Sequence, residues 1–89
     1  MLRQTLTIVN KLGLHARAAA KLVKLASQFE SEVHVKRLKR EVNGKSIMGV
    51  MLLAAAKGTE VELIIEGADE ATAMIQLKDL IQSGFGEEE

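Results

Sequence analysis

The sequence predicts an α+β fold in which a four-stranded, mainly antiparallel sheet is covered on one face by three helices. Segments with strand-type alternation and segments with helix-type periodicity follow each other in the order β-α-β-β-α-β-α. The predicted strands each have one apolar and one polar face, which is typical of an antiparallel or mixed sheet with one face in water. Amphipathic helices would cover the apolar face, giving an open-faced, two-layer sandwich.

The first third of the chain supplies one strand and one long helix. Residues 2–9 alternate between apolar and polar side chains, and residues 10–14 form a connection that contains Gly13. Residues 16–29 are rich in alanine and leucine, which favour helix. We expect the buried stripe of this helix to comprise Ala16, Ala19, Ala20, Val23 and Ala26, with Leu22 and Leu25 beside it.

The middle third predicts a hairpin followed by a short helix. Residues 32–38 alternate, residues 37–40 form a turn, and residues 41–43 form a short strand. Asn43 and Gly44 are a strong turn signal. Ser46 then stands where an N-cap belongs, and Gly58 is placed to end the apolar helix that runs to Ala56.

The last third predicts a strand, a helix and a tail. Residues 60–66 alternate clearly, and Asp69 is placed to cap a helix over residues 70–82. Gly84 would close that helix, and we expect the acidic residues 86–89 to fray. No linker, repeat or low-complexity block interrupts the chain, so residues 1–89 are expected to form one domain.

The composition of the 89 residues excludes several functions. There is no cysteine, and two histidines without a helical ligand pair give no metal-ligand spacing, so neither a metal nor a cofactor is expected. Phe29 and Phe85 are the only aromatic residues, which argues against a stacking platform for nucleic acid. No apolar run reaches the ~18 residues of a membrane span, and a cytoplasmic location is the default expectation.

The formal net charge is zero, but it is unevenly distributed along the chain. Residues 1–57 hold eleven Lys and Arg against three Glu, a net +8, and residues 58–89 hold one Lys against nine Asp and Glu, a net −8. An acidic partner could therefore meet the N-terminal half. From the sequence alone, charged faces in contact with water explain this charge distribution better than an acidic partner does.

His15 and Arg17 are the first candidates for chemistry. His15 lies at the junction of a loop and a helix N-terminus, although histidine is not a favoured cap. The first turn of a helix supplies free amides and the positive end of its dipole, and Arg17 adds planar donors suited to phosphate. Histidine can act as a covalent nucleophile, so a phosphoryl acceptor is one interpretation. Five residues alone favour the simpler one, a loop histidine and a surface arginine.

Ser46 is the second candidate. Its simpler role is an N-cap worth about 1 kcal/mol. A phosphate on Ser46 would also be accommodated at the helix N-terminus, beside any partner surface formed by Ile47 and Met48.

Residues 10–17 (NKLGLHAR) and 43–49 (NGKSIMG) resemble the histidine-containing phosphocarrier (HPr) family of the bacterial sugar phosphotransferase system. Residues 53–58 (LAAAKG) and 66–71 (EGADEA) match later landmarks of the family, and the resemblance covers the whole chain. Two separate motifs at the family's separation form a specific signal.

The resemblance implies a carrier rather than an enzyme. His15 would accept phosphate on Nδ1 from phosphorylated enzyme I and pass it to a histidine of enzyme IIA, while Arg17 would balance the charge of the phosphate. Ser46 would be the regulatory target of HPr kinase/phosphorylase. A monomer would dock its partners through one shared face, for which the implied residues are Ala16, Ala20, Lys24, Ile47, Met48 and Met51.

One position departs from the family pattern. Ala18 stands where the family usually has proline, which suits the first turn of a helix. This leaves open a regulatory, nitrogen-type branch of the phosphotransferase system. A small ligand-binding module of the β-α-β-β-α-β kind is a further alternative, although the last helix and the lack of an effector loop argue against it.

Overall fold

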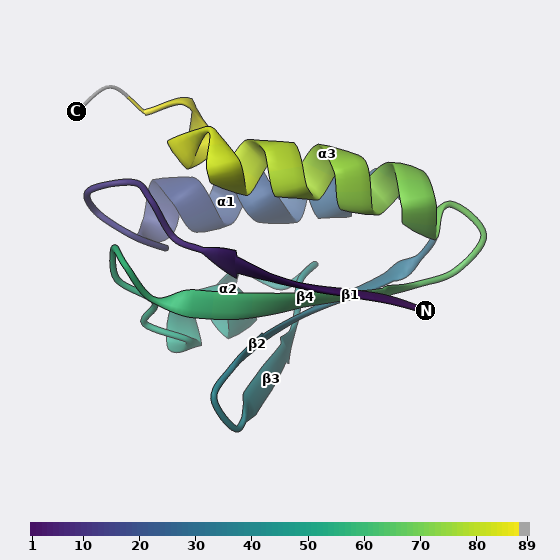
Figure 1. The fold of residues 1–89 in the computed structure, drawn as a ribbon, viewed down its shortest axis with the longest axis horizontal. Helices are drawn as coiled ribbons and strands as arrows, with labels where there is room; N and C mark the ends of the chain where they lie inside the picture. The colour runs from purple at the N-terminus through teal and green to yellow at the C-terminus, as the bar shows by residue number, and fades with distance from the viewer. Residues whose placement is uncertain (88–89) are drawn as a thin grey trace.

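The computed structural model describes residues 1–87 as one sheet with helices packed against it (Figure 1). The strands are Leu2–Thr7 (β1), Glu32–Arg37 (β2), Arg40–Asn43 (β3) and Glu60–Glu66 (β4). The helices are Ala16–Ala26 (α1), Ile47–Leu52 (α2) and Glu70–Gln82 (α3), followed by a 3₁₀ turn at Gly84–Gly86.

The four strands are arranged in the order β1-β4-β2-β3, and every neighbouring pair is antiparallel. Leu6 of β1 faces Val61 of β4, and Val35 of β2 faces Leu63 of the same strand. The last strand in sequence thus lies between the first two. The predicted α+β class and element order are confirmed.

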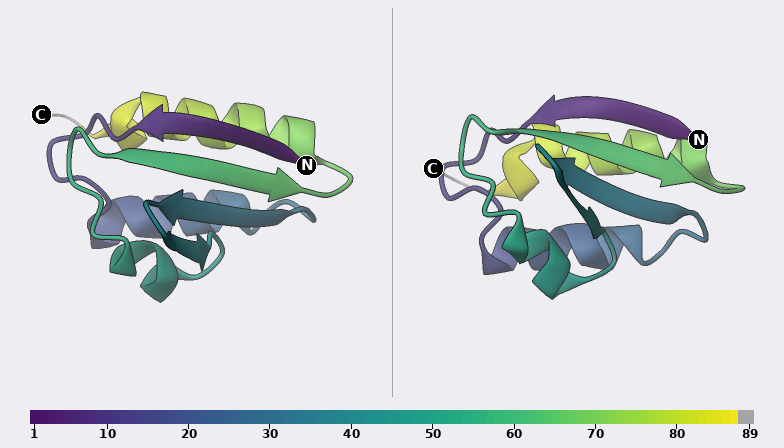
Figure 2. Two further views of the ribbon diagram at one scale, coloured as in Figure 1. Left: turned by 60° about the horizontal axis from the view of Figure 1, so that its bottom comes forward. Right: turned by 90° about the horizontal axis from the view of Figure 1, so that it is seen from below.

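One face of the sheet and the helices above it form the core. α1 and α3 lie across this face, while α2 lies beside α1 near β3 (Figures 1 and 2). Each fully buried aliphatic side chain contributes about 1.5–3 kcal/mol through removal from water. The sheet residues of this core are Leu6, Val33, Val35, Val61, Leu63 and Ile65.

The apolar stripe of α1 differs from the predicted one. Leu22 and Ala26 are buried together with Ala18 and Ala19, whereas Ala16 and Ala20 are exposed. The predicted stripe was wrong at those two positions. Ala18, Ala19 and Ala20 are consecutive and equally apolar, so composition does not determine the rotation of the helix about its own axis. The helix is thereby turned with Ala16 and Ala20 toward solvent.

Two predicted helices end earlier than their composition indicates. α1 ends at Ala26 rather than Phe29, because the Phe29 amide donates to the Ala26 carbonyl in a tighter, three-residue turn. α2 ends at Leu52, and Ala54 takes a positive φ of 50° directly after it. Gly58 therefore does not close α2.

β1 also ends earlier than expected, at Thr7 rather than Val9. The Ile8 amide donates to the Thr59 carbonyl at 2.9 Å, and the Gly58 amide donates to the Ile8 carbonyl at 2.7 Å. These bonds hold the chain leaving β1 against the turn that enters β4. The connection to α1 begins from this fixed point.

Asp69 occupies the N-cap position of α3, but its side chain does not cap that helix. Its carboxylate accepts hydrogen bonds from the amides of Glu30 (2.9 Å) and Ser31 (3.0 Å) and from the Ser31 hydroxyl. The prediction of a side-chain cap was wrong because these donors, in the loop between α1 and β2, bind the carboxylate instead. Asp69 ties the start of α3 to the end of α1.

We expect Asp69→Asn to destabilise the fold near neutral pH. The Ser31 hydroxyl, with the Glu30 amide, holds the pKa of the Asp69 carboxyl below its usual value. The resulting stabilisation is present above the ordinary Asp pKa of about 3.9 and is lost as the pH falls through the lower folded pKa. Urea unfolding should give a lower midpoint for the variant at pH 7, and the difference from the wild type should shrink as the pH falls below the ordinary Asp pKa of about 3.9.

Asp79→Asn is the matched control, since the Asp79 side chain is exposed and makes no hydrogen bond within residues 1–87. A loss of stability in Asp69→Asn that stayed constant across this pH range would contradict the assignment.

Candidate functional site at the start of α1

His15 is the N-cap residue of α1. Its backbone is extended (φ −72°, ψ 177°), and its side chain makes no capping bond. The first hydrogen bond of the helix runs from the Ala19 amide to the His15 carbonyl at 2.8 Å. The three preceding amides of the first turn are therefore left for another acceptor, at the positive end of the helix dipole. The predicted position of His15 at a helix N-terminus is confirmed.

The loop before His15 is held rigidly from inside. Asn10 is 1% exposed, and its Nδ2 donates to the Gly13 carbonyl at 2.8 Å. The Leu14 amide donates to the carbonyl of Ala55 at 2.9 Å. Gly13 has a φ of +66°, and a Cβ there would overlap the Ala55 carbonyl oxygen. Glycine is thus required both by the left-handed backbone and by the close approach of the 54–59 segment.

The imidazole of His15 contacts the carboxylate of Glu87. Nε2 lies 2.9 Å from each of the two Glu87 oxygens, and the same carboxylate accepts a hydrogen bond from Asn10 Nδ2 at 2.8 Å. The hydrogen bond with His15 holds the pKa of the Glu87 carboxyl below its usual value. Nδ1 of His15 makes no hydrogen bond within residues 1–87.

Residues 86 and 87, which belong to the acidic tail expected to fray, have defined contacts in the structure. Phe85 is 1% exposed with a φ of +59°, and its carbonyl accepts a hydrogen bond from Lys21 Nζ at 2.7 Å. This anchor places Glu87 over His15. The rest of the expected tail, residues 88 and 89, lies outside the described residues. The sequence signal for this anchor is an aromatic residue, Phe85, that stands between two glycines in an otherwise polar segment.

Arg17 is exposed on the first turn of α1 and makes no ion pair within residues 1–87. Arg17 and His15, the predicted phosphoryl acceptor, line the same shallow depression. The residues around that depression are Leu12, His15, Ala16, Arg17, Lys21, Gly86 and Glu87. One arginine side chain and one lysine side chain, Arg17 and Lys21, thus flank the open helix terminus.

Ser46 is the N-cap of α2, as predicted. Its backbone is extended, and its Oγ accepts a hydrogen bond from the Gly49 amide at 3.1 Å. Ile47 and Met48 follow it directly and are exposed, Met48 by 71%.

The six residues of the implied docking face are all exposed, and they come from two adjacent helices. Ala16, Ala20 and Lys24 belong to α1, Ile47, Met48 and Met51 belong to α2, and the two helices are in contact. Leu12 and Leu52 are also exposed, by 65% and 58%, and sequence reasoning missed both. An exposed apolar surface next to a candidate site is a property of docking faces.

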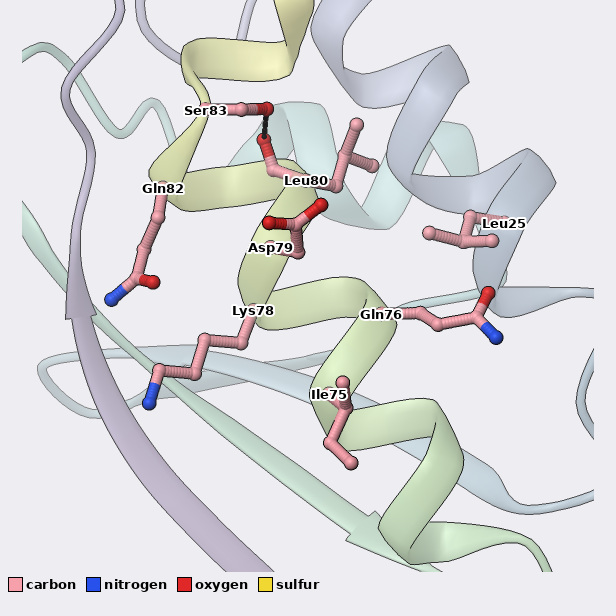
Figure 3. A pocket seen from close by; sticks show the side chains of 8 residues that line it. All are labelled: Leu25, Ile75, Gln76, Lys78, Asp79, Leu80, Gln82 and Ser83. Carbon is pink, nitrogen blue, oxygen red and sulfur yellow. Dashed lines mark hydrogen bonds between the residues drawn. The ribbon is translucent and has the colours of Figure 1, made fainter.

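A different depression lies between α1 and α3, lined by Leu25 and by residues of α3 and its end (Figure 3). It contains neither histidine nor arginine, and the Ser83 hydroxyl there donates to the Leu80 carbonyl at 2.9 Å. It brings none of the predicted site residues together. Among residues 1–87, no group of three potential metal ligands occurs, and no helix is long and apolar enough to cross a membrane.

Comparison with known proteins places this sheet order, with a histidine at an open helix terminus, in a class of small phosphoryl carriers. A family model described as "PTS HPr component phosphorylation site" matches residues 2–83. The chain is 62% identical to a phosphocarrier protein HPr of Neisseria meningitidis over 89 residues, which is all of both chains.

Solved structures agree. The crystal structure of HPr-C-His from Thermoanaerobacter tengcongensis matches with a TM-score of 0.96 and 49% identity, covering 100% of both chains. A phosphocarrier protein HPr from Bacillus anthracis matches with a TM-score of 0.88 and 33% identity over 91% of this chain and 96% of that one. The chain belongs to the HPr family of phosphocarrier proteins of the phosphotransferase system. Membership favours the carrier over the ligand-binding module.

We expect Gly13→Ala to destabilise the protein and to displace His15. The positive φ costs about 1–2 kcal/mol for a residue with a Cβ, and the overlap with the Ala55 carbonyl raises the total loss above about 2 kcal/mol. Urea unfolding measures this loss, and NMR shift changes at Leu14 and His15 report the displacement.

Gly58→Ala is the matched control. Gly58 also has a positive φ, of +89°, but nothing lies within 4 Å of an added Cβ. Its loss should therefore stay within the about 1–2 kcal/mol that the positive φ alone costs. Equal losses in the two variants would refute the close-approach argument.

Proposed function

We propose that Nδ1 of His15 is the atom that accepts and releases the phosphoryl group. The observation that carries this proposal is the position of the imidazole at the open N-terminus of α1, with 27% of the side chain exposed and Nδ1 unengaged within residues 1–87. A phosphoryl group there would lie near unpaired helix amides, and Arg17 would supply a fixed positive charge. Phosphoryl transfer depends mainly on such positioning and charge stabilisation.

The donor in this proposal is phosphorylated enzyme I, and the acceptor is a histidine of an enzyme IIA component. The chain acts as a carrier in the cytoplasm rather than as an enzyme, and its partners supply most of the catalysis. A monomer serves both partners in turn, so each complex must be transient.

The proposed docking face is the exposed surface formed by α1 and α2. Its apolar part, with Ile47, Met48 and Met51, is small and adaptable, since methionine fits more than one partner surface. Lys24 at its edge would attract acidic partners and raise the association rate. A small, partly charged interface of this kind suits short-lived complexes.

Ser46 is the proposed regulatory site, modified by HPr kinase/phosphorylase. Its hydroxyl oxygen already contacts the Gly49 amide, so a phosphate would remain at the N-terminus of α2 without unfolding it. About two negative charges would then stand beside Ile47 and Met48 and oppose docking with enzyme I.

Ala18 supports a second candidate, the regulatory, nitrogen-type branch of the phosphotransferase system. Its side chain is fully buried, and its amide is one of the three in the first turn of α1. Proline, usual at this family position, would lack that donor. The chemistry at His15 is the same in both branches, and only the partners differ.

We expect His15→Ala to abolish phosphorylation. Incubation of the wild type with enzyme I and phosphoenolpyruvate should add one acid-labile phosphate, detected by intact mass, because the imidazole is the acceptor. His34→Ala is the matched control, since His34 lies on β2 and contacts Glu41 instead. Absence of a phosphate on the wild type, or its persistence in His15→Ala, would refute the acceptor assignment.

We expect Ser46→Asp to weaken the complex with enzyme I about tenfold, because it places a negative charge on the apolar docking face. Ser46→Ala is the control. It should lose about 1 kcal/mol of stability with the cap but retain the affinity. Titration calorimetry measures the affinity. Equal affinities of the wild type and Ser46→Asp would refute the proposal that a charge at Ser46 opposes docking.

A further inference from the structure

We propose that Glu87 is a positioning residue that fixes the tautomer and orientation of His15 and directs phosphorylation to Nδ1. This inference rests on the proposed function, in which the His15 imidazole is the phosphoryl acceptor. The residue lies 72 positions away in the sequence, and it approaches the ring from the side opposite to the proposed reacting nitrogen.

The contact is well defined on both sides. Both oxygens of Glu87 lie 2.9 Å from Nε2, and the carboxylate side chain is only 13% exposed. Asn10 Nδ2 donates to Oε1 of Glu87 at 2.8 Å and to the Gly13 carbonyl at the same distance. The carboxylate is therefore held by the same buried amide that shapes the loop before His15.

The segment that carries Glu87 is anchored independently of the histidine. The Phe85 ring is buried in the core, and Lys21 binds the carbonyl of Phe85. Glu87 follows two residues after this anchor. The position of its carboxylate is thus built into the fold and does not require the imidazole to hold it.

An ionised carboxylate only accepts hydrogen bonds, so the contact selects the tautomer in which Nε2 carries the proton. The lone pair of the neutral ring then resides on Nδ1. A ring held through Nε2 is also prevented from rotating and from offering Nε2 to a phosphoryl donor. The same interaction therefore selects one nucleophilic nitrogen and protects the other.

The transfer step balances with this proton in place. The Nδ1 lone pair forms the new N–P bond, the bond from phosphorus to the leaving atom of the donor breaks, and its electron pair returns to that atom. The Nε2 proton stays on the ring, which becomes an imidazolium as the bond forms. Glu87 faces that developing positive charge, and a carboxylate hydrogen bond stabilises an imidazolium in the same way in hydrolytic triads.

The first test uses the unphosphorylated chain and needs no partner. Long-range ¹H–¹⁵N spectra of His15 should show protonation at Nε2 in the wild type, with a downfield and protected Nε2 proton. In Glu87→Ala, the protected proton should be lost and the Nδ1–H tautomer should become populated. Glu66→Ala, an exposed glutamate at the end of β4, is the control and should give the wild-type spectrum.

The second test uses phosphoramidate, a small phosphoryl donor that does not depend on docking. The wild type should react at Nδ1 alone, as identified by ³¹P and ¹⁵N NMR. Glu87→Ala should give a mixture of the Nδ1 and Nε2 isomers and should react at Nδ1 about tenfold more slowly. A loss of this size is typical when a residue that orients a functional histidine is removed. Glu87→Gln keeps an acceptor oxygen without the charge, so it should retain the isomer but not the rate.

The outcomes separate the two proposals. If the wild type accepts no phosphate on His15, the proposed function fails, whatever the tautomer. If the wild type reacts but Glu87→Ala keeps the same tautomer, isomer and rate, the role of Glu87 is refuted. A faster reaction in Glu87→Ala would also refute it, because the carboxylate would then be a lid over the imidazole.

Discussion

The pairing of β4 with two strands at once is the constraint on which the rest of the structure depends. β4 lies between β1 and β2, and it supplies Val61, Leu63 and Ile65 to the core. Its antiparallel register with β1 places the end of β1 beside the turn that precedes β4. The loop to His15 leaves from that point, so a long-range sheet contact determines where the helix α1 begins.

Much of the fold and of the histidine site follows from local patterns in the sequence. Alternation along residues 60–66 identifies β4 because Val61, Leu63 and Ile65 point inward at every second position, although Ile64 on the other face is also buried. Ser46 is recognisable because an N-cap serine needs only the amide three residues later. His15 stands out because it occupies a cap position that histidine seldom takes.

The remaining features depend on contacts between segments that are distant in the sequence. The residues around Asp69 do not show that its carboxylate will bind Ser31. Capping α3 and binding Ser31 would use the same carboxylate oxygens, so the sequence does not distinguish the two roles. The sequence does not distinguish Glu87 from the other acidic residues near it. Its contact with His15 depends on the burial of Phe85 in the core. The exposed position of Ala20 follows from the rotation of α1 about its axis, and that rotation depends on how the helix packs on the core.

The start of β1 and the Gly84–Gly86 turn lie at opposite ends of the molecule (Figure 1), and this has a practical consequence. The Met1 amine pairs with Glu70 at the start of α3, with Nα 3.1 Å from Oε2, whereas the Glu87 carboxylate lies 2.9 Å from Nε2 of His15. A fluorophore, affinity handle or immobilisation linker at the amino end would therefore extend away from the phosphoryl site. The same attachment at Gly86 or Glu87 would stand beside the reacting ring and would obstruct it.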